Sequence, residues 1–129
     1  MKVLLVMATR SIRARLAREL VVLPQLVLLG LADDLRQALD LAIRLEPDVI
    51  IVDFALPDEA GVDLLLALAR LPVRSRLLVV APPPLASYEH ASSILGVEAC
   101  FSHVRSAQDL PAFLCVTPPE PSSPSLETS

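Results

Sequence analysis

The feature that most constrains the fold is an alternation, along nearly the whole chain, of short apolar runs with segments of helical periodicity. The apolar runs are typical of buried strands, and the periodic segments place apolar residues on one helical face. The predicted strands are Val3–Met7, Gln25–Gly30, Val49–Val52, Leu77–Ala81 and Val97–Ser102. The predicted helices are Ser11–Leu20, Asp33–Leu45, Val62–Arg70, Ala86–Leu95 and Ser106–Val116. Such an alternation predicts a parallel sheet with helices on both faces.

The predicted fold class is α/β, a flavodoxin-like (βα)5 doubly wound parallel sheet with strand order 2-1-3-4-5. In this topology the ligand crevice lies at the carboxyl ends of the strands, beside the point where the strand order reverses. Asp53 directly follows the third apolar run, so we expect its carboxylate at this crevice. Asp33 is the expected N-cap of the second helix.

Length and composition predict one folded domain followed by a short tail. Residues 1–116 are the expected domain, because a chain of 129 residues leaves little for a second one. Residues 117–129, TPPEPSSPSLETS, are too polar and Pro-rich to bury much surface, so we expect a disordered tail or a linker. The chain contains no apolar run long enough to span a bilayer and no signal-peptide pattern, which predicts a cytoplasmic protein without a membrane contact.

Charge and motif content argue against several function classes. The net charge is −4 with acids and bases interspersed, so no basic face predicts direct binding of nucleic acid. Three glycines are too few for a phosphate-binding loop or a dinucleotide fingerprint, and two histidines without a ligand pattern predict no metal site. Phosphatases of the haloacid-dehalogenase type need a second acid two residues after the first, and Ala55 stands there. We therefore expect no enzyme and assign no catalytic residue.

The most specific motif lies in the stretch IIVDFALPDEAG. Its Asp53, Leu56, Pro57 and Gly61 match the pattern D-x-x-[ML]-P-x-x-x-G between a predicted strand and an amphipathic helix. With KVLLV near the start and GVEACF near the end, the chain resembles the receiver (CheY-like) domain of two-component response regulators over residues 2 to about 115. The resemblance implies a signalling module rather than an enzyme.

That resemblance also implies a chemistry for Asp53. In the family, the aspartate at this position accepts a phosphoryl group from a phosphohistidine of a partner kinase. A Mg²⁺ ion assists, held by an acidic pair after the first strand, the acceptor itself and the backbone carbonyl two residues on, here that of Ala55. A Thr or Ser after the fourth strand and a Lys after the fifth contact the phosphoryl oxygens.

The sequence departs from the family at each supporting position. Met7 and Ala8 stand where the acidic pair is expected, and neither side chain carries an oxygen. Ala81 stands at the hydroxyl position and His103 at the lysine position, while Cys100 occupies the place of the switch aromatic. The resemblance therefore identifies an atypical, or pseudo-receiver, member. Mg²⁺ binding is expected to be weak or absent, because one carboxylate holds this ion only loosely.

Three alternatives stay open for Asp53. It is a phosphoacceptor, an unmodified anion paired with a nearby cation such as Arg10 or His103, or a structural remnant. The favoured function is a protein-interaction module that uses the region 85–115 to contact a sensor kinase, an output protein or a second copy of the chain. The alternative is a functional response regulator switched by phosphorylation of Asp53.

Overall fold

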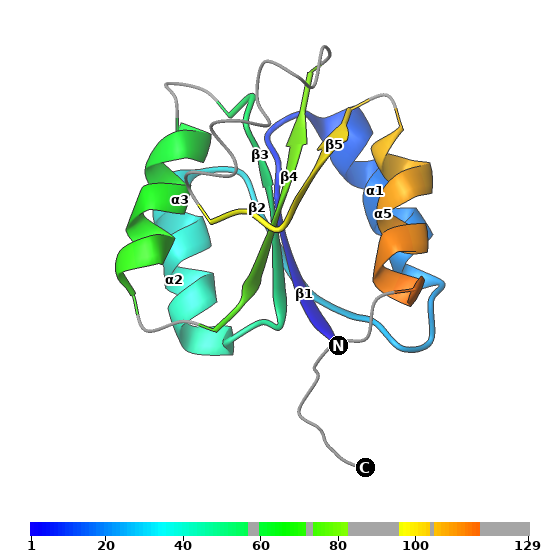
Figure 1. Cartoon of the computed structure of the whole chain (residues 1–129), viewed down its shortest axis with the longest axis horizontal. Coiled ribbons are helices and arrows are strands. Elements are labelled where there is room, and N and C mark those ends of the chain that lie inside the picture. Colours follow the sequence, from blue (N-terminus) through cyan, green and yellow to red (C-terminus); the bar gives the residue numbers. More distant parts are fainter. Residues whose placement is uncertain (57–59, 72–73, 83–95, 104, 117–129) are drawn as a thin grey trace.

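The computed structural model describes residues 1–56, 60–71, 74–82, 96–103 and 105–116. Its strands are β1 (Lys2–Val6), β2 (Val27–Ala32), β3 (Val49–Asp53), β4 (Arg76–Ala81) and β5 (Ala99–Ser102). Its helices are α1 (Arg10–Val21), α2 (Leu35–Leu45), α3 (Ala60–Arg70) and α5 (Ser106–Val116). All strands pair in parallel in the order β2-β1-β3-β4-β5, which confirms the predicted topology (Figure 1). The predicted helix Ala86–Leu95 and the tail 117–129 lie outside the described residues.

The helices cover the sheet from both sides: α2 and α3 lie on one face, and α1 and α5 on the other (Figure 1). Successive strand residues point to opposite faces, so the strands feed two separate apolar cores. Leu4, Ile50 and Val79 belong to the core that includes the buried residues of α2 and α3. The second core combines strand residues such as Leu5 and Ile51 with the buried leucines of α1 and α5. Burial on both faces explains why the strands are continuous apolar runs in the sequence.

The second strand differs in its bounds from the predicted Gln25–Gly30. β2 begins at Val27 because the preceding residues form a turn, in which Leu26 N–H donates to the carbonyl of Leu23 at 3.1 Å. It continues to Ala32 because pairing with β1 extends that far, and the Ala32 carbonyl accepts the N–H of Met7 at 2.9 Å. Long-range pairing with β1, rather than local hydrophobicity, therefore sets both ends of this strand.

The N-cap of α2 is Asp34, and the prediction of Asp33 is wrong by one residue. The Asp34 carboxylate accepts the backbone N–H of Gln37 at 2.8 Å, while the Gln37 side chain accepts the N–H of Asp33 at 3.3 Å. This arrangement resembles a capping box with Gln at its third helical position, except that the Gln37 side chain accepts the N–H of the residue before the N-cap. In the described part of the chain, no helix is long and apolar enough to cross a membrane.

Candidate functional site

The candidate site is the carboxyl end of the sheet, centred on Asp53. Asp53 is the last residue of β3, and its register places it beside Val80 of β4. Pairing continues one residue further, since the Phe54 N–H donates to the Val80 carbonyl at 2.9 Å. Asp53 is fully buried, one of two buried polar residues among those described. Burying a carboxylate is costly unless hydrogen bonds compensate, so its partners define the site.

His103 is the side chain that meets Asp53. Its backbone N–H donates to the Ala81 carbonyl at 2.9 Å, which extends the β4–β5 pairing by one residue. The imidazole Nε2 then lies 2.7 Å from Asp53 Oδ1, and only 14% of the histidine side chain is exposed. The Ser106 hydroxyl donates to the carbonyl of His103 at 3.2 Å and ties this turn to α5. The two side chains are therefore held together by strand pairing on one side and a helix start on the other.

The two oxygens of the Asp53 carboxylate have different surroundings. Oδ1 accepts the backbone N–H of Ala55 at 2.8 Å as well as contacting the imidazole of His103. Oδ2 is buried and has no hydrogen-bond partner among the described residues. An ionised carboxylate only accepts hydrogen bonds, so His103 presents Nε2–H to it in either the neutral or the protonated form. Since Nε2 is engaged, Nδ1 is the ring nitrogen left for another partner.

Gly61, near the start of α3, lies close to the backbone of Asp53. A Cβ at this position would lie 2.6 Å from the Asp53 carbonyl oxygen and 3.1 Å from the Cα of Phe54. The start of α3 therefore approaches the backbone of Asp53 more closely than any side chain permits. The Leu56 N–H also donates to the Asp53 carbonyl, at 3.3 Å. The spacing from Asp53 to Gly61 thus reflects a backbone contact, independent of what the Asp53 side chain does.

Met7 and Ala8 follow β1 at the positions where the resemblance implies an acidic pair. Met7 is fully buried in the core shared with α1 and α5, and Ala8 packs against the opposite core. The side chains at these two positions carry no oxygen, so they add no carboxylate beside Asp53. Within the described residues, no group of three or more His, Cys, Asp or Glu side chains is placed to hold a metal ion. Among the described residues, the side chains at the acidic-pair positions thus offer no oxygen ligand for the magnesium site that the resemblance implies.

Arg10, the other cation proposed for Asp53, lies elsewhere. It is the exposed first residue of α1, and the ion pairs between described residues include none that joins it to Asp53. Arg13, which the sequence reasoning did not select, reaches the β1 end instead. Its guanidinium donates to the Met7 carbonyl at 3.2 Å and lies 4.0 Å from the carboxylate of Asp33. The structure therefore places Arg10 in solvent and not beside Asp53.

The other expected site positions surround the pair without contributing charge. Ala81 is fully buried at the end of β4, and Ala55 is exposed in the turn after β3. Cys100, at the switch position, is partly buried against the core of α2 and α3. Of the candidate residues, the structure thus brings Asp53, His103 and the backbone of Ala55 into direct contact, and leaves Cys100 on the sheet.

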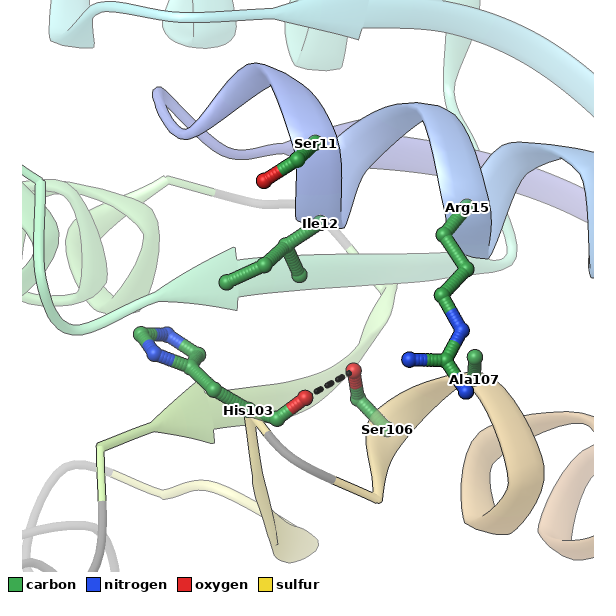
Figure 2. A pocket seen from close by; sticks show the side chains of 6 residues that line it. All are labelled: Ser11, Ile12, Arg15, His103, Ser106 and Ala107. Atoms are coloured by element: carbon green, nitrogen blue, oxygen red, sulfur yellow. Dashed lines mark hydrogen bonds between the residues drawn. The ribbon is translucent and has the colours of Figure 1, made fainter.

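A cavity of about 120 Å³ opens beside His103, between the first turns of α1 and α5 (Figure 2). Ser11, Ile12 and Arg15 of α1 line one side of it. His103, Ser106 and Ala107 line the other, and Figure 2 shows the Arg15 side chain extending towards the start of α5. The sequence reasoning missed this cavity. Its only sequence signal was the helical spacing that places Ile12 and Arg15 on one face of α1.

No protein-family model matches the sequence, and the search of curated proteins found no significant match. Solved structures do match. The signal receiver domain of the response regulator NarL from Mycobacterium tuberculosis has a TM-score of 0.80 at 18% identity, covering 88% of this chain and 92% of that one. The response regulator domain of Thermotoga maritima CheB has a TM-score of 0.78 at 22% identity, covering 92% and 98%. The isolated REC domain of RcsB from Salmonella enterica serovar Typhimurium has a TM-score of 0.79 at 18% identity, covering 89% and 85%. The chain thus has the fold of a response-regulator receiver domain.

Proposed function

We propose that the chain is an atypical receiver domain of two-component signalling, a pseudo-receiver that acts through protein contacts without an aspartyl phosphate at Asp53. The observation that carries this proposal is the contact between His103 Nε2 and Asp53 Oδ1 at 2.7 Å. The histidine contacts one carboxylate oxygen, Oδ1, and the other, Oδ2, is buried, so neither is open to a phosphodonor arriving from solvent. A response regulator would need an accessible acceptor oxygen, with a cation placed to neutralise the transferred group.

The side chains at the strand ends support the same conclusion. Transfer of a phosphoryl group to a carboxylate brings two anions together, and the family meets this requirement with a metal ion. Met7 is buried in the core and Ala8 has no donor atom, so neither replaces the acidic pair. Ala81 offers no hydroxyl to the phosphoryl oxygens. We expect Mg²⁺ binding to be weak or absent, and no cofactor.

A protein contact is the expected output. We propose that it uses the region 85–115, of which the structure describes residues 96–103 and 105–115 with β5 and most of α5. The partner is a sensor kinase, an output protein or a second copy of the chain. We expect neither enzymatic activity, direct binding to nucleic acid nor a membrane contact, and a cytoplasmic location. Size-exclusion chromatography with light scattering at several protein concentrations tests self-association, since a stable dimer would identify the second copy as partner.

The second candidate function is a phosphoaccepting response regulator. It is favoured by the position of Asp53 at the end of β3 and by the close backbone contact with Gly61, both independent of the missing ligands. Incubation with acetyl phosphate, with and without Mg²⁺, separates the candidates. Intact-mass measurement should show no Mg²⁺-dependent, hydroxylamine-labile phosphoryl group. A Mg²⁺-dependent adduct that is lost in Asp53→Asn would establish the second candidate and reject the first.

A further inference from the structure

We propose that two copies of the chain associate through β2, whose free edges pair in antiparallel orientation and join the two sheets into one. The inference goes beyond the proposed function, whose contact region 85–115 includes β5. β2 and β5 are the two opposite edges of the sheet, so association at β2 leaves that region free in both copies. The dimer therefore presents two such regions to a partner, which raises avidity without any new contact.

The first step is the chemistry of the β2 edge. β2 pairs with β1, and its outer row of backbone N–H and C=O groups has no strand partner in the described part of the chain. Edge strands are usually protected from pairing by a charged side chain or a proline. The sequence of β2, VLLGLA, has neither, and no residue from Leu20 to Ala32 is charged. Val27 and Leu31 on this strand are 55% and 40% exposed, so the edge is apolar as well as unpaired.

The second step is which backbone groups of β2 face outward. The Val27 N–H donates to the Met1 carbonyl at 2.8 Å, and the Ala32 carbonyl accepts the Met7 N–H at 2.9 Å, so both ends of β2 face β1. Along a regular strand, residues five positions apart point to opposite sides. One extra residue must therefore interrupt the alternation between Val27 and Ala32.

That extra residue is a β-bulge at Leu29. Two consecutive residues of β1 pair with Leu28 and Gly30, so Leu29 has no counterpart on β1. Counting from either end of the strand, Leu28 and Leu31 are then the residues that direct their N–H and C=O groups away from β1. They are three positions apart, whereas the outward residues of a regular strand are two apart.

The bulge decides which strand can pair with this edge. A regular strand of another protein cannot form hydrogen bonds with both Leu28 and Leu31, because its own outward groups have a different spacing. A second copy has the same bulge. About a twofold axis between Leu29 and Gly30, Leu28 of each copy lies opposite the partner's Leu31, and the two bulges lie opposite each other. The matched spacing therefore selects a second copy in antiparallel orientation.

The side chains agree with this register. Leu28 packs against the core of α1 and α5, whereas Ala32 and the Cα of Gly30 face the core of α2 and α3, so Leu31 lies on the same face as Leu28. Residues directly opposite each other in an antiparallel pair share a face of the sheet. The exposed Leu31 is thus covered by the partner's Leu28. Val27, on the other face, lies opposite the partner's Ala32.

The charges at the two ends of β2 also favour the antiparallel orientation. Lys2, beside the first residue of β2, forms no ion pair with another described residue, and the Asp48 carboxylate contacts its backbone N–H rather than its ammonium. Asp33 and Asp34 directly follow the last residue of β2, and Asp33 lies 4.0 Å from Arg13. Antiparallel pairing brings the acidic end of each copy towards the basic start of the other, whereas parallel pairing would place like ends together.

The experiment uses the full chain, with sedimentation velocity over a dilution series and amide hydrogen exchange measured by NMR. We expect a reversible dimer of the 13.9 kDa chain. The Leu28 and Leu31 amides should be protected from exchange only at concentrations where the dimer forms, a readout that needs no variant. In a sample mixed from labelled and unlabelled chains, contacts between chains should join Leu28 to the partner's Leu31, which identifies the antiparallel register.

Two substitutions at Leu31 test the edge. Leu31→Pro removes an N–H that faces outward and is tolerated on an edge strand, so the variant should fold but remain monomeric. Leu31→Lys adds the kind of charge that protects other edge strands and should raise the dissociation constant of the dimer at least about tenfold. The matched control is Leu66→Lys on α3, because Leu66 is similarly exposed, at 43%, but lies on a helix. It should leave the dissociation constant unchanged, and circular dichroism checks that each variant is folded.

Three outcomes overturn the inference. They are a chain that is monomeric at every concentration, a dimer that is as stable in Leu31→Lys as in the wild type, and contacts between chains in parallel register. A monomer would leave the edge to a strand of another protein, and an undiminished dimer would place the contact elsewhere, as in the region 85–115. The proposed function is instead rejected by a Mg²⁺-dependent phosphoryl group on Asp53, so the two failures are distinguishable.

Discussion

Two side-chain pairs hold the last strand of the sheet, one at each end. Glu98, one residue before β5, pairs with Arg76 at the start of β4 through two hydrogen bonds of 2.8 and 2.6 Å. His103, one residue after β5, contacts Asp53 at 2.7 Å. The Glu98 side chain is 40% exposed, whereas Asp53 is fully buried. The two cationic-side partners, Arg76 at 17% and His103 at 14%, are similarly buried, so the difference lies in the carboxylates: water screens Glu98 and is excluded from Asp53.

The two carboxylates differ in how much each depends on its partner. A pair that water surrounds contributes little and tolerates loss of a partner. A buried carboxyl group depends on each partner it has, since loss of one leaves an uncompensated polar group. Asp53 already has one oxygen without a described partner, so the His103 contact is the main compensation for its burial. Substitutions at the carboxyl end of the sheet should therefore lower the unfolding free energy more than substitutions at the other end.

The largest effect is expected from His103→Ala. Removing the imidazole leaves Asp53 buried with the Ala55 N–H as its one donor among the described residues, which should cost about 2–4 kcal/mol of unfolding free energy. Urea denaturation followed by circular dichroism measures the change. In the Asp53→Asn background the same substitution should cost less, because a neutral amide is less costly to bury. Equal costs in both backgrounds would show that the pair is not coupled and would remove the contrast with Arg76 and Glu98.

Gly61→Ala should rank second, with a loss of about 2 kcal/mol. The added Cβ would lie 2.6 Å from the Asp53 carbonyl oxygen, a backbone atom that cannot rotate away. Gly30→Ala is the matched control, because its Cβ would meet side-chain atoms at ordinary distances, Leu41 at 3.6 Å and Leu4 at 3.9 Å. The control should change the unfolding free energy by less than about 1 kcal/mol. If Gly61→Ala and Gly30→Ala lower the unfolding free energy by the same amount, the close approach of α3 to the Asp53 backbone is not what makes Gly61 necessary.

Much of the architecture was predictable because strand burial leaves a local trace. Continuous apolar runs and helical periodicity identified the strands and helices that the structure describes, and parallel connectivity then limited the strand order. The position of Asp53 followed from the same pattern, since β3 is apolar up to that residue. Errors occurred where pairing or capping decides a boundary, as with the start of β2 and the choice of Asp34 over Asp33.

The details of the site were less predictable because they depend on side chains distant in the sequence. His103 and Arg10 were both possible cations for Asp53, and only the packing of β5 against β4 brings the histidine to it. Arg13 and Arg15 carry the same charge as Arg10 on the same helix, and helical rotation decides which one faces the β1 end and which the cavity. Helical periodicity shows which residues share a face of the helix, but it does not show what that face contacts.

The smallest effect is expected from Glu98→Gln, and its pH dependence makes the comparison quantitative. The hydrogen bond from Arg76, together with its positive charge, lowers the pKa of Glu98 below the ordinary value of 4.5 although partial burial opposes this. A carboxyl group whose pKa is lower in the folded state adds stability above its unfolded pKa, and this contribution disappears as the pH falls through the folded value. The unfolding free energy of the wild-type protein should therefore exceed that of Glu98→Gln by about 0.5–1 kcal/mol near neutral pH, after allowance for screening.

This difference in unfolding free energy should shrink below about pH 4.5. It should also shrink in about 1 M salt, where the screening length falls to about 3 Å. Urea denaturation of both proteins at neutral and acidic pH measures it. A salt-resistant loss as large as that of His103→Ala would mean that the Arg76–Glu98 pair, despite the exposure of Glu98, is as important for holding β5 as the buried pair at the other end.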